Sequence, residues 1–145
     1  MWPQTYEERL ASWVELRESA SQLELQDFLE RVNNWWFRAP LNNRYLHWDD
    51  QRRWPDPWQL LADNIYCERA RALGMLYTIA MAWNTDIEDV NIARTSEGDA
   101  LVLINQGKYI LNWDLDDILN ISLANFQVIN YLEEETISNI LGFKE

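Results

Sequence analysis

Apolar residues in the first 37 positions recur at helical spacing and predict two consecutive helices. Thr5 and Glu8 have the pattern of a capping box before the first helix, and Ser21 and Glu24 repeat it before the second. The apolar stripes are Leu10, Trp13 and Val14 in the first helix, and Leu25, Phe28, Leu29, Val32, Trp35 and Trp36 in the second. Two adjacent amphipathic helices predict a helical hairpin.

The next stretch, "APLNNRYLHWDDQRRWPDP", is rich in turn formers and charges of both signs and predicts a long ordered connection. Asp56 and Pro57 at its end form a good N-cap and first helical position. We expect the helix that they begin to reach Trp83. Gly74 interrupts its interior, which indicates close packing against another element.

Beyond that helix the pattern changes to short apolar runs separated by turns. "DVNIAR", "ALVLINQ" and "KYILNW" predict three antiparallel strands, with turns at Gly98 and Gly107. "DLDDILNIS" predicts a turn or short helix, "NFQVINYL" a fourth strand, and "EEETISNILGF" a closing helix. The expected fold is α+β in a single domain of residues 1–145: an N-terminal helical hairpin, a long aromatic connection, a central helix packed on a small antiparallel sheet, and a C-terminal helix.

The chain is strongly acidic, with 24 acidic residues against 12 basic ones and a formal net charge of −12. Phosphate backbones repel such a chain, so we expect no direct binding to nucleic acid. The same charge is compatible with docking on a basic protein or with mimicry of DNA.

One cysteine allows no internal disulfide, and the start of the chain, "MWPQTYEERL", lacks the basic-then-apolar pattern of a signal peptide. The most apolar run, residues 73–83, is too short to span a bilayer. These features predict a soluble cytoplasmic protein without membrane contact.

Cys67 lies in the predicted central helix and is open to two interpretations. It shares a strip with Leu60, Ala70 and Gly74, and small residues on one strip indicate a buried position in a tight contact between helix and sheet. The alternative is a nucleophile, which needs a base within hydrogen-bond reach. His47 is the one histidine of the chain, so Cys67 and His47 are the candidate catalytic pair.

"YCERARALG" followed by "DALVLINQGKYILNWD" resembles the transglutaminase-like cysteine enzymes. In that family the nucleophile lies on a helix, the next strand bears a histidine, and the following strand bears an Asp or Asn. The resemblance places Cys67 as the nucleophile, Asp99 or Ala100 at the histidine position, and Asn112 or Asp114 as the orienting residue. No histidine follows Cys67, so the resemblance implies a degenerate scaffold without the acid–base chemistry.

The aromatic stretch "NNWWFRAPLNNRYLHWDD" and the later "WPDPWQLLADNIYCERARALGMLYTI" resemble small proteins of tailed phages with large myovirus genomes. This resemblance implies a virion component or an accessory protein of infection. It places the protein in the host cytoplasm or in the virion, and it assigns no catalytic residues.

No motif predicts a metal or a cofactor. Asp114, Asp116 and Asp117 lack the Gly and the distant Glu of a calcium loop, and favour a solvated turn. One His and one Cys are too few for a zinc site, and four Gly leave no phosphate-binding loop.

The most unusual feature is the Trp/Arg-rich segment, residues 35–58. Its candidate binding residues are Trp35, Trp36, Arg44, Tyr45, Trp48, Arg52, Arg53, Trp54 and Trp58. Trp, Tyr and Arg are enriched at binding hot spots, but the same rings could instead pack the hairpin onto the domain.

The sequence therefore favours a non-enzymatic interaction or assembly protein, of phage origin, that docks on a protein partner or on itself through this segment. The first alternative is a thiol enzyme of the transglutaminase or papain type that uses Cys67 and His47. The second is an acidic DNA mimic that inhibits a DNA-binding protein.

Overall fold

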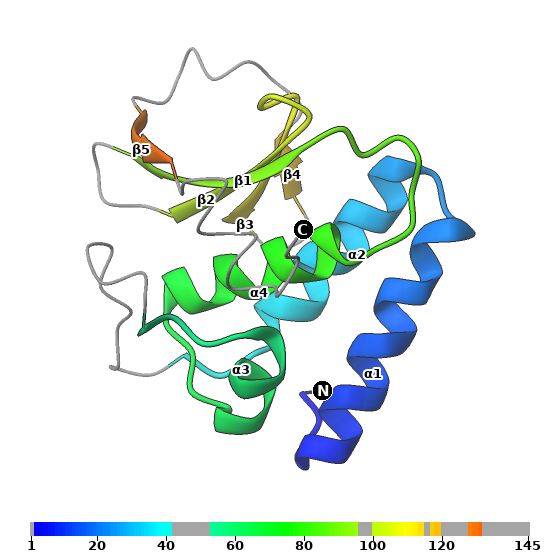
Figure 1. The fold of residues 1–145 in the computed structure, drawn as a ribbon, viewed down its shortest axis with the longest axis vertical. Helices are drawn as coiled ribbons and strands as arrows, with labels where there is room; N and C mark the ends of the chain where they lie inside the picture. Colours follow the sequence, from blue (N-terminus) through cyan, green and yellow to red (C-terminus); the bar gives the residue numbers. More distant parts are fainter. Residues whose placement is uncertain (1, 42–52, 96–99, 115–116, 120–127, 132–145) are drawn as a thin grey trace, which may run out of the picture.

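A computed structural model describes residues 2–41, 53–95, 100–114, 117–119 and 128–131, and shows an α+β fold in which helices cover one face of an antiparallel sheet (Figure 1). The helical elements are α1 (Tyr6–Glu18), the short 3-10 helix η1 (Ser19–Ser21), α2 (Leu25–Phe37), α3 (Pro57–Asp63) and α4 (Glu68–Ala80). The α+β prediction is confirmed. The predicted C-terminal helix and the residues between 41 and 53 lie outside the described ranges.

The two N-terminal helices begin in different ways. Thr5 forms the expected capping box: its hydroxyl accepts from the Glu8 N–H at 3.1 Å, and the Glu8 carboxylate accepts from the Thr5 N–H at 3.1 Å. The predicted second capping box is wrong. Ser21 belongs to η1 and its hydroxyl donates to the Glu18 carbonyl, while α2 begins after Glu24 without a side-chain cap.

The helix predicted from Pro57 to Trp83 is two helices. Asp56 caps α3 as expected, and its carboxylate accepts from the Gln59 N–H at 2.7 Å. Asn64 then ends α3 in the left-handed conformation, with φ 53°, which asparagine tolerates better than most residues. The Asn64 side chain accepts a hydrogen bond from the Trp2 indole at 2.8 Å, so a tertiary contact holds the break in place.

The sheet contains β1 (Val90–Thr95), β2 (Ala100–Ile104), β3 (Tyr109–Asp114), β4 (Asp117–Leu119) and β5 (Val128–Tyr131). The strand order is β4-β3-β2-β1-β5, and every pairing is antiparallel. β1, β2 and β3 lie where the sequence predicts them, and β5 confirms the fourth strand. The prediction of a turn or short helix at 114–122 is wrong for 117–119, because those residues pair with β3.

α4 is the central helix, as expected, and α2 also contacts the sheet, at β3 and β4. α4 packs on β1, β2 and β3, and on its other sides it contacts α1, α2 and α3 (Figure 1). Residues 72–79 of α4 are all buried, which is typical of a helix enclosed on every side. The position of α4 therefore fixes the positions of the helices packed on it.

One hydroxyl at the centre of the core joins three helices. The Thr78 hydroxyl of α4 accepts from the indole N–H of Trp13 (α1) at 2.8 Å and of Trp36 (α2) at 2.9 Å, and donates to the Gly74 carbonyl at 2.7 Å. All of these groups are buried. Because an unpaired buried indole N–H is costly, this arrangement sets the relative positions of the three helices.

Gly74 lets the Trp36 ring lie directly against the backbone of α4. A Cβ atom built at Gly74 would lie 2.5 Å from the Trp36 ring, far inside normal contact distance. The close packing predicted from this glycine is therefore with α2, and the ring occupies the space that any side chain would need.

Gly74→Ala is expected to lower the free energy of unfolding by about 1–3 kcal/mol through overpacking against Trp36. At an unobstructed helix interior the same change would stabilise by up to about 1 kcal/mol. Chemical denaturation measures the sign of this change in the free energy of unfolding. In a Trp36→Leu background, Gly74→Ala should no longer destabilise the protein. Equal destabilisation in both backgrounds would rule out the Trp36 ring as the cause.

Candidate functional site

The Trp/Arg-rich segment supplies much of the core. Trp36 is 1% exposed and packs edge-on against Trp35 and Tyr66, with ring centroids 4.9 and 5.9 Å away. Trp54 is also buried. Trp36 and Trp54 therefore serve as core residues. Trp35 is also largely a core residue, in contact with Trp2 and Trp36, and 8% of it remains exposed.

Other members of the segment reach the surface. Trp58 of α3 is 43% exposed and its ring lies edge-on to Trp13, while Arg53 is exposed. Two exposed indoles outside the segment, Trp83 and Trp113, were not among the candidates. The remaining candidates, Arg44, Tyr45, His47, Trp48 and Arg52, lie outside the described residues.

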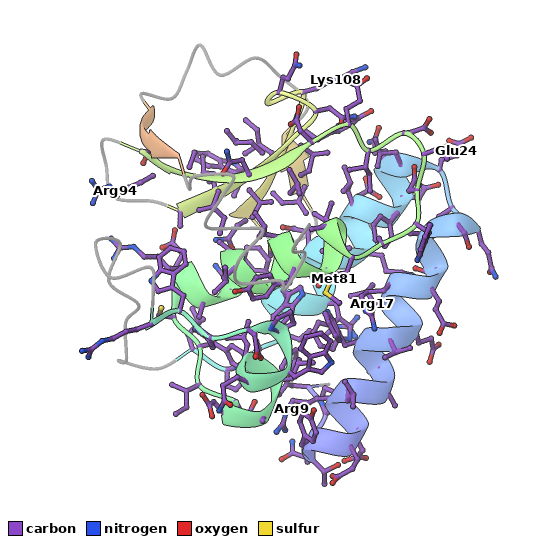
Figure 2. All side chains as sticks on the ribbon, viewed as in Figure 1. Arg9, Arg17, Glu24, Met81, Arg94 and Lys108 are labelled. Atoms are coloured by element: carbon purple, nitrogen blue, oxygen red, sulfur yellow. The ribbon has the colours of Figure 1, made fainter. Side chains whose placement is uncertain are left out.

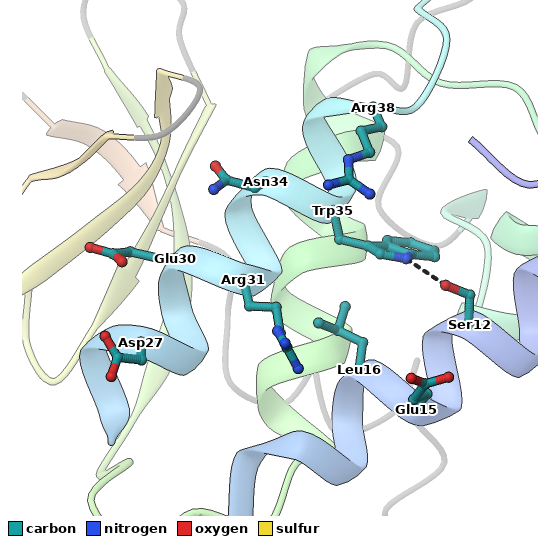
Figure 3. Close-up of a pocket in the computed structure, with 9 residues that line it drawn as sticks. All are labelled: Ser12, Glu15, Leu16, Asp27, Glu30, Arg31, Asn34, Trp35 and Arg38. Carbon is teal, nitrogen blue, oxygen red and sulfur yellow. Dashed lines mark hydrogen bonds between the residues drawn. The ribbon is translucent and has the colours of Figure 1, made fainter. Parts of the chain in front are cut away.

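Trp35 lines a surface groove of about 500 Å³ between α1 and α2 (Figure 3). The groove exists because both helices pack on α4 and leave a gap between their outward faces. Its lining residues are Ser12, Glu15 and Leu16 of α1, with Asp27, Glu30, Arg31, Asn34 and Trp35 of α2 and Arg38 at its C-cap.

The indole of Trp35 is held in place by a contact across the groove. Its N–H donates to the Ser12 hydroxyl at 2.8 Å, as the dashed line in Figure 3 marks. Trp35 is mostly buried, and it forms the apolar floor together with the buried Leu16. Because one partner of this bond comes from each helix, the floor has a fixed geometry.

Two guanidinium groups flank this floor. Arg31 and Arg38 are both exposed and, at positions i and i+7 around Trp35, they lie on one face of α2. Figure 3 shows them on the side of α2 that faces α1, whereas Glu30 and Asn34 extend from its other side. Within the described ranges, neither guanidinium forms an ion pair or a side-chain hydrogen bond.

Of the nine described residues that line the groove, Trp35 alone was among the predicted binding residues, and the other eight, Arg31 and Arg38 included, were missed. The pattern Arg31-x3-Trp35-x2-Arg38 could have been found from helical spacing. The contribution of α1 could not, because it depends on how two helices cross.

Cys67 lies at the N-cap of α4 instead of inside a long helix, which corrects the predicted position. Its side chain is 3% exposed, so the expectation of a buried thiol is confirmed. It lines a cavity of about 160 Å³ together with residues that include Arg53, Asp63 and Ala70. The distance from Cys67 to His47 lies outside the described part of the chain.

Tyr66, which precedes Cys67, is fully buried, and its hydroxyl has no hydrogen-bond partner in the described structure. Burial raises the pKa of Tyr66 well above its usual range, an effect that the nearby Arg9 only partly offsets. The Tyr66 phenol therefore stays protonated near neutral pH and cannot act as a base there.

Asn112, a buried residue of β3, connects this strand to β2, α2 and α4 through hydrogen bonds. Its side-chain amide donates to the Ala100 carbonyl at 2.8 Å, its side-chain oxygen accepts from Arg71 at 2.7 Å, and its backbone N–H donates to the Asn33 side chain at 2.9 Å. Asn112 has φ 65°, and the bonds of its side chain hold this conformation. Burial lowers the pKa of Arg71, while Glu68 opposes this shift.

The junction around Asn112 brings together three positions that the transglutaminase-like resemblance singles out. The backbone carbonyl of Glu68, next to Cys67, accepts from the Asn112 amide at 3.3 Å, and the Glu68 carboxylate accepts from the Ala100 N–H at 3.2 Å. Ala100 offers no acid–base group, and the Asn112 side chain is engaged in structural bonds. The arrangement links the start of α4 to the sheet.

In the described part of the chain, no group of acidic, His or Cys side chains is arranged to hold a metal ion. No helix there is long and apolar enough to cross a membrane. Of the aspartates considered for a cation, Asp114 ends β3, Asp117 begins β4, and Asp116 lies outside the described residues.

Comparison of the chain with models of known protein families finds no match, and comparisons with curated proteins and with solved structures find none either.

Cys67 is expected to react slowly with iodoacetamide at neutral pH in the native protein, and at the rate of a free thiol in denaturant, because it is 3% exposed when folded. Mass spectrometry over time measures both rates. A native rate that equals or exceeds the denatured rate would contradict a structural role and support an activated thiol.

Asn112→Gly and Asn112→Ala separate the contribution of the Asn112 side-chain hydrogen bonds to stability from the cost of its positive φ. Both remove bonds to Arg71 and Ala100, and each is expected to lower the free energy of unfolding by about 1–3 kcal/mol. Ala should cost about 1–2 kcal/mol more than Gly, because only Gly adopts a positive φ without strain. Equal free energies of unfolding in urea for the two variants would show that the backbone of β3 at residue 112 relaxes in both.

Proposed function

We propose that this chain is a non-enzymatic interaction or assembly protein that docks a protein partner in the groove between α1 and α2. The observation that carries the proposal is the pair of exposed guanidiniums, Arg31 and Arg38, on either side of the Trp35 indole. Arg and Trp are the residue types that contribute most to binding at protein interfaces. The Trp/Arg-rich segment contributes Trp35 and Arg38 to this site.

The rigidity of the groove supports the same function. Trp13 of α1 and Trp36 of α2 both donate to Thr78, and Trp35 bonds to Ser12 across the gap. A groove whose walls are fixed before binding loses less entropy when a partner enters. The helical hairpin is therefore a preorganised surface.

The partner in this proposal is a protein, which can include a second copy of the chain. The net charge of −12 disfavours nucleic acid as a direct ligand. The resemblance to tailed-phage proteins supports an origin in a phage and a role in the host cytoplasm or virion. The single cysteine is compatible with that reducing compartment.

One observation favours thiol chemistry as a second candidate. Cys67 lies at the N-cap of a 13-residue helix and lines a cavity of about 160 Å³. His47 would have to act as its base. Low exposure of the sulfur opposes this function. The alkylation rate of Cys67 decides between a structural and a catalytic thiol.

A photocrosslinking amino acid in place of Glu15, which lines the groove and is exposed, tests the docking proposal. In extracts of the cells that naturally make the chain, we expect a discrete adduct with one protein. Excess unlabelled wild-type chain should compete for it, and excess Arg31→Ala/Arg38→Ala double variant should not.

The control position is Lys108, which is exposed in the turn between β2 and β3 and lies away from α1 (Figure 2). The proposal fails if Lys108 gives the same adduct as Glu15, or if neither position gives one. An adduct with the chain itself identifies self-association, which sedimentation then verifies.

A further inference from the structure

The two guanidiniums of the groove lie among carboxylates, in a chain whose acidic residues outnumber its basic ones by 24 to 12. Glu15, Asp27 and Glu30 line the same groove, yet within the described ranges neither Arg31 nor Arg38 forms an ion pair with any of them. Asp27 lies one turn before Arg31 on α2, so the ion pair is sterically possible, but the described structure does not form it.

The spacing of the pair restricts what can bind to both. Seven residues on a helix span about 10 Å along its axis, at 1.5 Å per residue. A second helix laid along the groove presents side chains at the same spacing from positions i and i+7, whereas an extended strand alternates its faces and does not match this spacing. The side chain between them, at i+3 or i+4, would then lie over Trp35.

Guanidinium forks recognise carboxylates in a bidentate manner, which gives both strength and direction. The net charge of −12 repels an acidic partner at long range. At physiological salt, charges more than about 8 Å apart are largely screened, so contacts inside the groove dominate once the surfaces meet.

We infer that the groove between α1 and α2 binds an acidic helix of a protein partner, whose carboxylates at i and i+7 pair with Arg31 and Arg38 while an apolar side chain between them covers Trp35. This inference rests on the proposed docking function and names the chemistry of the partner. It is a helix-in-groove interaction in which charge sets the register.

The test uses a fluorescently labelled helical peptide in an alanine–glutamine host, with two glutamates seven residues apart and a leucine between them. We expect saturable binding to the full chain by fluorescence anisotropy, with affinity that falls as salt rises. The Arg31→Gln/Arg38→Gln double variant should bind about tenfold more weakly or worse, and Arg31→Lys/Arg38→Lys should fall between, because lysine lacks the fork.

The matched control is Arg69→Gln/Lys108→Gln, which removes two positive charges outside the groove and changes the net charge by the same amount. It should bind within about twofold of the wild type, because screening limits distant charges. Circular dichroism should show that both double variants remain folded, since none of the four side chains is buried.

Three outcomes would overturn the inference: equal weakening in both charge-matched variants, equal binding of a peptide with its glutamates four residues apart, or no binding at all. Sedimentation that changes only in Arg31→Gln/Arg38→Gln would make a second copy of the chain the occupant and also overturn it. If the peptide fails while the Glu15 crosslink forms, the docking function stands and only the acidic helix is wrong.

Discussion

The fold depends on the contact of Trp36 with Gly74 and Thr78 at the centre of α4. The ring lies where a side chain of residue 74 would be, and its N–H shares the Thr78 hydroxyl with Trp13. These contacts combine tight packing with full hydrogen bonding of buried polar atoms, so no small shift of one helix preserves both. α1, α2 and α4 therefore have one mutual arrangement.

The groove follows from that arrangement. Since α1 and α2 are each attached to α4, the space between their outer faces is fixed mainly by the core. The Ser12–Trp35 hydrogen bond is the link that crosses it near the floor. Arg31 and Arg38 form no ion pair within the described part of the chain, so the two helices can hold them at a constant spacing while both side chains remain open to a partner.

Hydrogen bonds join the N-terminal end of α4 to the sheet. Asn112 and Glu68 connect the first turn of the helix to β2 and β3, and Cys67 lies buried beside this junction. Ala100 and Asn112 make structural hydrogen bonds here, and these bonds account for the left-handed backbone of Asn112 without assigning it chemistry.

The sequence by itself determined the elements whose signal is local. Capping at Thr5 and Asp56, the apolar stripe of α2 and the strand pattern of β1 to β3 all follow from neighbouring residues. Tertiary structure alone decided the break between α3 and α4 at Asn64, where the Trp2 indole donates a hydrogen bond to the Asn64 side chain. It also decided which tryptophans lie in the core and which at the surface. An indole is equally suited to a core and to an interface, so its role depends on which elements meet around it. The groove likewise joins residues of two helices, and no local pattern records how those helices cross.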